Sequence, residues 1–533
     1  MTQLSNPPLD VAHGLAIGQK RRLSPYWIIA ICLALYLLPA VPVLFELGDE
    51  GTIIDGGVRV AEGQVPFRDF FDLIGPGSFY WLAIFFKLLG TTWFATRVAW
   101  FLVFFSTNLI LVHLARSLGL GLEAVILFVT TSFPLAYTSS HHVDSNFLAI
   151  LSFALFLRWI RTRHLSLIFL VGATVGLTAC FMQHKGALLL LSFIAIMAIS
   201  HRREPHFARS AMALAGGCVL VLASVVALYW SAGAIPDLIY TNIVWPATNY
   251  SSINHVPYGY GLKVYFWRPW YNALKAAFSP APAVVVIGIL TVPFLVVVAL
   301  PFLLAFVAAV RRRRAFTHST LPYWIAGFAL WLSEAHRTDY VHLALGSPVL
   351  LLLGFYFAEG SQGRMARNCR QAVAVCAVFL AAVNLLLTLS ARIRLNTRRG
   401  PVYVSAPDAV LDFLDSHTAP GDPVFLYPHL SVYYFLSATT NPTRYGALTY
   451  RMNTDAQFQE VTKSLDTARP RYAVWDQDFY ATVARKVYPT YHDPPENTQV
   501  IERYLSEHYR VLGTARRGVA FLERRVREAG AEP

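Results

Sequence analysis

Two adjacent carboxylates, Asp49 and Glu50, follow directly on the first long apolar run of the sequence. If that run spans a bilayer, the pair stands at its edge, where ionised groups are costly to desolvate and mark functional sites. A carboxylate in such a place can accept the proton of an attacking hydroxyl as a general base. We therefore interpret Asp49 and Glu50 as candidate catalytic residues, and a solvated loop pair is the alternative.

A second polar cluster, Ser139-Ser140-His141-His142-Val143-Asp144, separates two later apolar runs. Imidazole and carboxylate groups can ligate a metal, but neighbouring histidines on a helix point in different directions, and the set lacks a metal-binding spacing. Participation of a divalent metal is therefore left open. Hydrogen bonding by His142 and Asp144 in a polar cavity is the favoured interpretation.

Two further clusters combine histidines with cations. Gln183-His184-Lys185 occupies a hairpin between apolar runs, where Lys185 either extends to the interface or supplies a counter-charge for phosphate. The nine residues Glu334-Ala-His336-Arg337-Thr-Asp339-Tyr340-Val-His342 lie at the edge of another run. The planar guanidinium of Arg337 can bind phosphate, and a salt-bridged loop is the alternative. On one face, the four clusters would form a site where a lipid phosphate leaves and a polar acceptor attacks.

The composition indicates the elements that must position these clusters. Of the 533 residues, 55% are hydrophobic and 14% are charged, against about 25% charged in soluble proteins. Residues 1–390 hold only 26 of the 44 Lys and Arg and 15 of the 31 Asp and Glu. We therefore predict a lipid-embedded region, residues 25–390, after a cytoplasmic segment, residues 1–24, and before a water-exposed domain, residues 391–533.

The apolar runs predict about eleven transmembrane helices, since a span needs about 20 apolar residues. The expected spans are Pro25 to Phe45, 93–115, 119–138, 145–160, 165–182, 186–200, 210–231, 281–310, 320–333, 343–357 and 371–390. The first run is too long for a cleaved signal peptide. With the N-terminus in the cytoplasm, every connector assigned inside bears arginine, as the positive-inside rule requires. The four polar clusters and the C-terminal domain then share the outer face.

Two outer connectors are long, residues 46–92 and the aromatic-rich residues 232–280, which either anchors at the interface or stacks on sugar or isoprenoid. In the C-terminal domain we expect a helix over Pro407 to Ser416, strands at 424–427 and 472–475, and a hairpin around Arg517-Gly518, which together indicate a small α/β domain. The net charge of +13 arises in short loops, so we expect no nucleic-acid partner.

The first outer loop resembles that of the GT-C glycosyltransferases, in the branch of protein O-mannosyltransferases and the lipid A aminoarabinose transferase. The residues that carry the resemblance are Gly48-Asp49-Glu50-Gly51, Gly63 through Asp72, and Gly75-Pro76-Gly77-Ser78-Phe79-Tyr80-Trp81. In outline the resemblance covers residues 1–390, where Asp144, the Lys185-Gly186 hairpin and Arg337 are further points of similarity. The tail segment Pro442-Thr443-Arg444-Tyr445 is similar to bacterial members with soluble extensions, which implies a bacterial inner membrane and a periplasmic or extracellular tail.

The resemblance implies an inverting transferase that uses a polyprenyl-phosphate-linked sugar. Asp49 would be the base and Glu50 would position it or the acceptor. Lys185, His184 and Arg337 would bind the donor phosphate, although the lysine that several relatives carry before the Pro/Gly segment is missing at Leu73-Ile74-Gly75. Residues expected to contact sugar or acceptor are Asp144, His142, Asp339 and His342. The sequence has no nucleotide-binding loop and requires no cofactor; membrane lipids and an acceptor of open identity are the other partners.

Two other classes compete with this interpretation. A transporter or flippase of lipid-linked glycans would place charged groups near the bilayer midplane, in repeated halves, whereas here they lie at helix ends and no halves repeat. A receptor or scaffold anchored by its helices would need far fewer of them. The pattern therefore favours the transferase.

Overall fold

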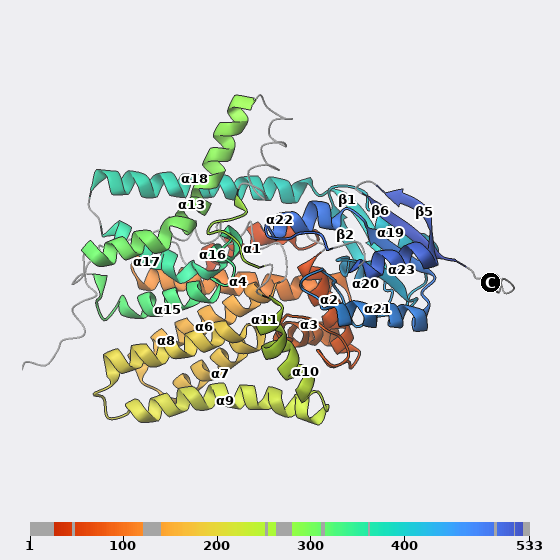
Figure 1. The fold of residues 1–533 in the computed structure, drawn as a ribbon. Helices are drawn as coiled ribbons and strands as arrows, with labels where there is room; N and C mark the ends of the chain where they lie inside the picture. The colour runs from red at the N-terminus through yellow and green to blue at the C-terminus, as the bar shows by residue number, and fades with distance from the viewer. Residues whose placement is uncertain are drawn as a thin grey trace, which may run out of the picture.

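The computed structural model describes residues 26–44, 48–120, 140–250, 254–262, 280–310, 315–360, 363–494, 498–515 and 518–525. In this part of the chain a bundle of roughly aligned helices is followed, at one end, by a mixed α/β region formed by the C-terminal residues (Figure 1). The predicted span at 119–138 falls almost entirely outside the described residues. So do Ser139 of the second polar cluster and the run Arg311–Arg314.

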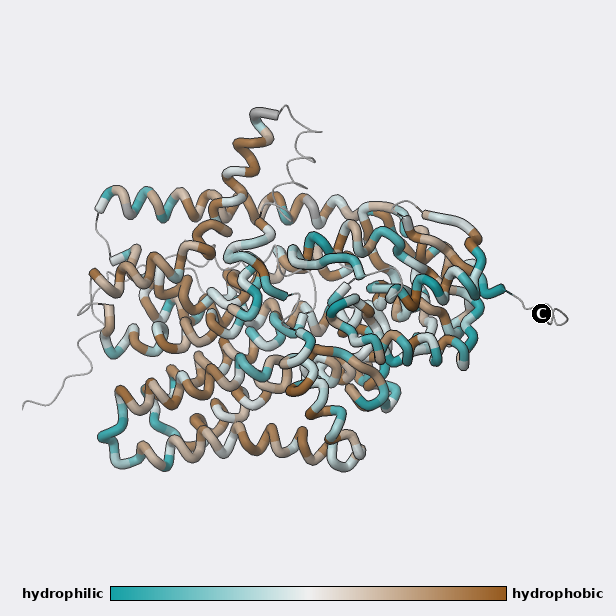
Figure 2. Tube along the Cα trace, viewed as in Figure 1, coloured by the Kyte–Doolittle hydropathy of each residue, from teal (hydrophilic) through white to brown (hydrophobic). Residues whose placement is uncertain are grey.

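The apolar runs form helices, and their polar flanks coincide with the helix ends (Figure 2). The helices of the bundle and of the first outer loop are α1 (Tyr26–Leu37), α2 (Asp49–Ala61), α3 (Pro76–Leu89), α4 (Trp93–Ser117), α6 (His141–Thr162), α7 (Leu165–Phe181), α8 (Gln183–His201), α9 (Phe207–Ser231), α13 (Pro280–Val310), α15 (Leu321–Ser333), α16 (Tyr340–Gly346), α17 (Pro348–Glu359) and α18 (Arg364–Ser390). The outer connector after α9 forms α10 (Ile235–Ile239), η3 (Tyr240–Val244) and α11 (Trp245–Thr248).

Six of the described helices are long and apolar enough to cross a membrane, and the pair α16 and α17, bent by 72°, makes a possible seventh. The six are α4, α6, α8, α9, α13 and α18. The chain is therefore a multi-pass membrane protein. The apolar helices at 26–40, 165–181 and 321–333 are shorter than a full span, so the predicted total of about eleven spans stays a prediction.

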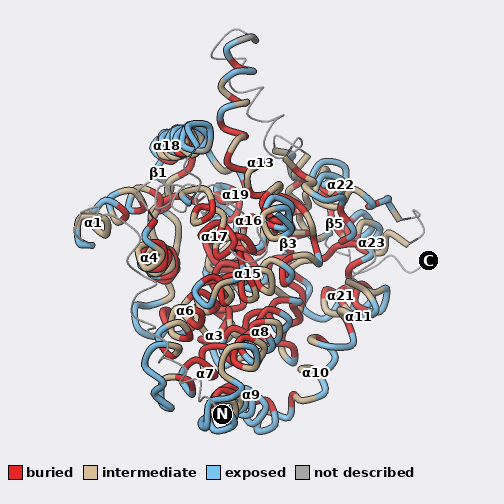
Figure 3. The backbone as a smooth tube through the Cα atoms, turned by 90° about the vertical axis from the view of Figure 1, so that its left-hand side faces the viewer, coloured by how far each residue is buried: buried red, intermediate tan, exposed pale blue. Residues whose placement is uncertain are grey.

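The bundle core lies between α6, α7, α8, α15 and α17, where Phe153, Phe193 and Leu350 are completely buried. Figure 3 views the bundle from the end opposite the C-terminal region. These inner helices are largely buried, while the outward sides of α9 and α18 are exposed. Helices α7 and α9 touch through small residues. A Cβ atom on Gly172 would lie 1.9 Å from the carbonyl oxygen of Leu214, so only glycine permits this approach.

The C-terminal region contains a four-stranded sheet in the order β3-β4-β6-β5. Strands β3 (Val424–Tyr427) and β4 (Tyr472–Asp476) are parallel, and β6 (Val519–Arg524) is antiparallel to both β4 and β5 (Tyr509–Ala515). Both predicted strands are confirmed, as is the final hairpin. The further elements are β1 (Ile393–Thr397), β2 (Gly400–Val404), α19 (Ala409–His417), α20 (Val432–Leu436), α21 (Asp455–Ala468), η6 (Tyr480–Ala484), α22 (Arg485–Val487) and α23 (Val500–His508).

The first outer loop and the C-terminal region share one hydrophobic core. Residues of α2, α3, β2, α19, α20 and β4 are buried together in it. The contact between α2 and α20 is so close that a Cβ on Gly51 would lie 2.4 Å from the backbone nitrogen of Val432. The amide of Phe71 also donates to the carbonyl of Arg444 at 2.8 Å, so the motif around Arg444 holds the loop. This packing fixes the start of α2.

Candidate active site

Helix α2 begins at Asp49, so Asp49 and Glu50 occupy successive positions and point about 100° apart. Glu50 is completely buried, and its Oε2 accepts a hydrogen bond from Nη2 of Arg97 at 3.0 Å. The Arg97 guanidinium lies 4.1 Å from the ring centre of Trp93. Asp49 is exposed. The two carboxylates therefore differ: Glu50 is held by a buried cation, whereas Asp49 is accessible at the helix N-terminus, where a negative charge is stabilised.

The charge of Asp49 acts on groups from several segments. Burial raises the pKa of Asp72 to about 7, and the negative charge of Asp49 adds to this effect. Burial likewise raises the pKa of Tyr488 to about 12, again with a contribution from Asp49. In the opposite sense, burial lowers the pKa of His429, and the charge of Asp49 opposes that shift. The charge of Asp49 thus influences groups of the first outer loop and of the C-terminal region.

Lys185, near the start of α8, is completely buried in an ion pair. Its Nζ donates to Oε1 of Glu334 at 2.6 Å, to Oδ1 of Asn146 at 2.6 Å and to Oγ of Ser145 at 2.9 Å. Neither side chain of the pair has exposed surface. The charge of Lys185 is therefore balanced inside the protein by a carboxylate that follows α15.

Arg337 is nearly buried and is fully engaged by protein groups. Its Nε donates to Oδ2 of Asp339 at 2.6 Å, Nη1 donates to Oδ1 of Asn254 at 3.0 Å, and Nη2 donates to the carbonyl of Val487. The guanidinium also lies 5.0 Å from the ring centre of Tyr488. Arg337 thus joins the loop after α15 to the C-terminal region.

Three histidines from two segments converge beside these ion pairs. His142 comes from α6, and His336 and His342 come from the segment that follows α15. One ring nitrogen of each lies within 4.8 Å of the others, an arrangement that can hold a metal ion. The ring of His184 lies 5.2 Å from that of His336. We refer to His142, His336 and His342 as the histidine cluster.

Asp144 does not join the histidine cluster. It lies two positions after His142 on α6, about 200° around the helix, and it is buried. With Ser78, Trp81 and Trp100 it lines a small cavity between α3, α4 and α6. The structure therefore separates Asp144 from the other polar residues of its motif, and its contact with sugar or acceptor stays a prediction.

Two tyrosines connect Asp49 with the histidine cluster. The ring of Tyr250 lies 6.1 Å from that of His336, and burial raises its pKa with a contribution from the charge of Asp49. Tyr488 contacts Arg337 and is influenced by Asp49 in the same way. The charge of Asp49 therefore influences two tyrosines that lie beside His336 and Arg337.

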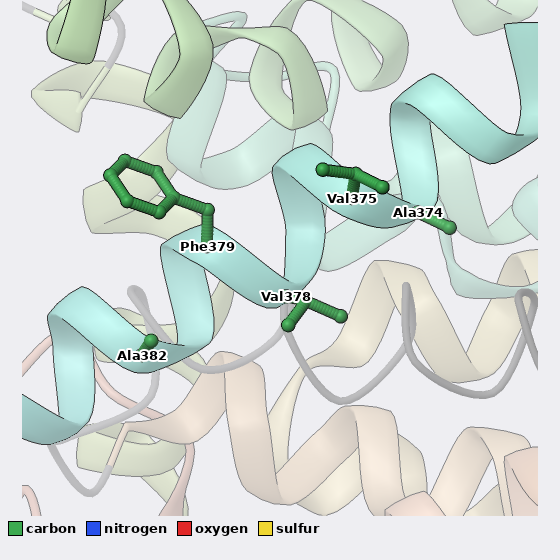
Figure 4. A pocket seen from close by; sticks show the side chains of 5 residues that line it. All are labelled: Ala374, Val375, Val378, Phe379 and Ala382. Atoms are coloured by element: carbon green, nitrogen blue, oxygen red, sulfur yellow. The ribbon is translucent and has the colours of Figure 1, made fainter.

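An apolar hollow lies elsewhere, on the outer side of α18 (Figure 4). It is lined by Ala374, Val375, Val378, Phe379 and Ala382. All five residues belong to one helix that can cross the membrane, so this hollow is part of the surface that faces lipid. It carries no group that could do chemistry.

No protein-family model matches the chain, and no curated protein sequence matches it. Among solved structures, ArnT from Cupriavidus metallidurans bound to undecaprenyl phosphate is similar with a TM-score of 0.54, at 11% identity, over 95% of this chain and 98% of that chain. ArnT is a membrane glycosyltransferase of the GT-C fold. The chain has a GT-C-like fold.

Two further solved structures are similar with lower scores. The archaeal oligosaccharyltransferase AglB from Archaeoglobus fulgidus, in complex with an inhibitory peptide and a dolichol-phosphate, gives a TM-score of 0.49 at 11% identity, over 94% of this chain and 74% of that chain. ArnT in the apo state gives 0.48 at 14% identity, over 93% and 97%. At these identities the likeness extends to the fold and no further.

Several polar residues of this GT-C-like fold were missed by the sequence analysis. The sequence does mark Arg97, because it is the one Asp, Glu, Lys or Arg within the apolar run 93–115, where a charged residue needs a buried partner. His429 and Tyr488 have no such mark, because they reach Asp49 only through the packing of the C-terminal region on the first outer loop. His336 was part of a quoted motif, but its approach to His142 depends on helix packing.

Proposed function

We propose that the chain is a membrane glycosyltransferase that moves a sugar from a polyprenyl-phosphate-linked donor to an acceptor lipid, glycan or protein. The observation that carries the proposal is the exposed carboxylate of Asp49 in a GT-C-like fold, whose charge influences two tyrosines that lie beside His336 and Arg337. The ArnT structure with the same fold is bound to undecaprenyl phosphate, a ligand of the chemistry that the donor requires.

The proposed reaction is a single displacement. The oxygen of an acceptor hydroxyl attacks the anomeric carbon of the sugar, and a new carbon–oxygen bond forms. The bond between that carbon and the donor phosphate oxygen breaks, and its electron pair leaves with polyprenyl phosphate. The carboxylate of Asp49 takes the hydroxyl proton as general base. The configuration at the anomeric carbon inverts, and no covalent enzyme intermediate is needed.

The other residues have supporting roles in this proposal. Glu50, anchored by Arg97, fixes the orientation of the first turn of α2. Lys185, with its neighbour His184, and Arg337 are proposed to bind the donor phosphate. Because Lys185 and Arg337 are paired with carboxylates, they must exchange a partner or act at a distance.

Sugar or acceptor contacts are proposed for four side chains, which lie in two places. Three of them lie at the histidine cluster: His142, His342 and Asp339, whose Oδ1 lies 2.8 Å from Nδ1 of His342. The fourth, Asp144, lines the small cavity beside α3. The location proposed for the site is the outer face of a bacterial inner membrane, on the side opposite the N-terminus.

The proposal is tested by measuring sugar transfer. Purified chain is incubated with a radiolabelled polyprenyl-phosphate sugar and a membrane extract as acceptor. We expect transfer by the native chain and a loss of at least about 100-fold for Asp49→Asn, the effect of removing a general base. Asp455→Asn is the matched control, because Asp455 is also the exposed first residue of a helix, α21.

Each alternative outcome has a clear meaning. Equal transfer by the native chain and Asp49→Asn would remove Asp49 from the mechanism. Absence of transfer from every donor tested would contradict the enzyme function. Movement of labelled donor across a vesicle bilayer, without release of polyprenyl phosphate, would favour a transporter instead.

A further inference from the structure

We propose that His142, His336 and His342 bind a divalent transition metal, with zinc as the best match. One ring nitrogen of each histidine lies within 4.8 Å of the others. A tetrahedral zinc site with Zn–N bonds of about 2.1 Å requires separations of about 3.4 Å. The ring nitrogens therefore need to approach one another by up to about 1.4 Å, which side-chain rotation can supply. Three neutral imidazoles suit zinc rather than magnesium or calcium, which prefer oxygen.

The hydrogen bonds of the three rings leave the same nitrogen available on each. Nδ1 of His142 lies 2.8 Å from Oε2 of Glu334, and Nδ1 of His342 lies 2.8 Å from Oδ1 of Asp339. Nδ1 of His336 lies 3.2 Å from the carbonyl oxygen of Ser333. Among the described residues, no hydrogen-bond partner is found for the Nε2 atoms.

This is the arrangement that metal-ligating histidines adopt in proteins. An Nδ1–H that donates to a carboxylate or to a backbone carbonyl fixes the tautomer, orients the ring and makes Nε2 a stronger ligand. Each histidine of the cluster has such an acceptor. Three rings from two separate segments thus combine an Nδ1 with an acceptor and an Nε2 without a described partner, and one ring nitrogen of each lies close to the others.

The charges around the histidine cluster carry no net positive charge that would repel a dication. Glu334 is paired with Lys185, and Asp339 is paired with Arg337. The nearby ion pairs are therefore neutral in sum, as are three neutral imidazoles. The exposed side chain of His336 gives the metal a route of entry from solvent. Three protein ligands leave one position of a tetrahedral zinc open, as in catalytic zinc sites.

The open position suggests what the metal binds, and this step rests on the proposed function. Lys185 and Arg337, which are proposed to bind the donor phosphate, are each paired with a protein carboxylate, so a phosphate beside them needs a further positive charge. A zinc ion on the histidine cluster would supply that charge beside Tyr250, whose pKa is in turn influenced by the charge of Asp49. The ligand for the open position is therefore the phosphate of the lipid-linked donor or of the released polyprenyl phosphate.

Metal binding is tested first, on the full chain purified in detergent. The protein is stripped with a chelator, reloaded with Zn²⁺, and analysed for metal content and affinity. We expect one zinc per chain and an affinity at least about 100-fold lower in His336→Ala, since even loss of an outer-shell partner costs 10–100-fold. His255→Ala is the matched control, because His255 is an exposed histidine of the neighbouring loop.

Two readouts separate metal binding from folding. His336→Ala and the native chain, both stripped, should have the same melting temperature, because the His336 side chain is exposed. Co²⁺ bound to the native chain should give a visible absorption band that His342→Gln weakens and His255→Ala preserves. A native chain that retains no zinc, or a His336→Ala chain that binds zinc as tightly as the native one, would overturn the site.

A second experiment tests the phosphate ligand. Undecaprenyl phosphate in nanodiscs is titrated against the stripped and the zinc-loaded chain, and we expect at least about tenfold tighter binding with zinc. Unchanged affinity would overturn the phosphate role while the zinc site stands. Zinc binding together with full sugar transfer by Asp49→Asn would contradict the proposed base and leave the metal site intact, so the two proposals fail separately.

Discussion

Asp49 and Glu50 are neighbours in sequence, but their surroundings give them different chemistry. The sequence motif predicts a carboxylate pair at the edge of the membrane, and it contains no information about which of the two is free. The answer comes from Arg97, one turn inside α4, which holds Glu50 in a buried ion pair. A buried charge that loses its partner is strongly destabilising, so Glu50 is fixed while Asp49 remains available.

Asp72 provides a prediction at the same scale. Burial raises its pKa to about 7 in the folded chain, above the value of about 3.9 for an unfolded aspartate. The folded chain therefore binds more protons between pH 4 and 7, and the contribution of Asp72 to stability falls as pH rises through this window and is constant above it. At about 1.4 kcal/mol per pKa unit, we expect a decrease of roughly 2–4 kcal/mol, which Asp72→Asn abolishes.

Thermal unfolding in detergent from pH 4.5 to 8 measures this effect as the difference between native and Asp72→Asn. Asparagine retains the oxygen that accepts the amide hydrogen of Ile74, at 2.9 Å in the native chain, so the loop should keep its shape. Asp455→Asn serves as the control for loss of an exposed carboxylate. Parallel melting curves for native and Asp72→Asn across the window would contradict the buried, proton-binding state of Asp72.

At the scale of elements, hydropathy alone places most helices correctly, because a lipid-embedded helix must be apolar along its length. The strand positions 424–427 and 472–475 were also predictable, since their buried, β-branched and aromatic residues stand between turn signals. The hairpin of β1 and β2 and the helix α23 were not predicted. β1 is short and largely exposed, and α23 is polar on average, so its apolar face is visible only once it packs on the sheet.

The contact between α2 and α20 carries the prediction at this scale. A Cβ on Gly51 would meet the backbone of Val432 at 2.4 Å, and backbone atoms cannot swing aside as a side chain can. We expect Gly51→Ala to lower the free energy of unfolding by about 1–3 kcal/mol, the usual cost of overpacking. Because Asp49 lies two residues earlier on α2, sugar transfer should fall as well.

Gly288→Ala is the matched control, because Gly288 is also helical and a Cβ there would meet no atom within 4 Å. Thermal unfolding and sugar transfer are measured on both variants. A Gly51→Ala chain as stable and as active as the Gly288→Ala chain would show that the two elements do not touch as described.

At the scale of the whole molecule, charge density predicts a membrane region followed by a water-exposed domain. In the described structure the tail and the first outer loop share one hydrophobic core. Helix α2 and the tail lie at one end of the bundle (Figure 1), and Arg337, in the segment that carries His336 and His342, donates to the carbonyl of Val487 in the tail. The connector between α8 and α9 lies at the other end, where Oε1 of its Glu204 meets Nη2 of Arg163 at 3.0 Å. The compartment of the tail is therefore the compartment of the candidate site.

The positive-inside rule assigns the end with Arg163 to the cytoplasm, so the tail and the site should face the outside. Alkaline phosphatase needs disulfides that form only outside the cytoplasm, and we expect it to be active when fused after residue 533. Fused after residue 163, it should be inactive, while a green fluorescent reporter should give the reverse pattern. Phosphatase activity at residue 163 and none after residue 533 would reverse the orientation, and Asp49 would then have to act on a cytoplasmic acceptor.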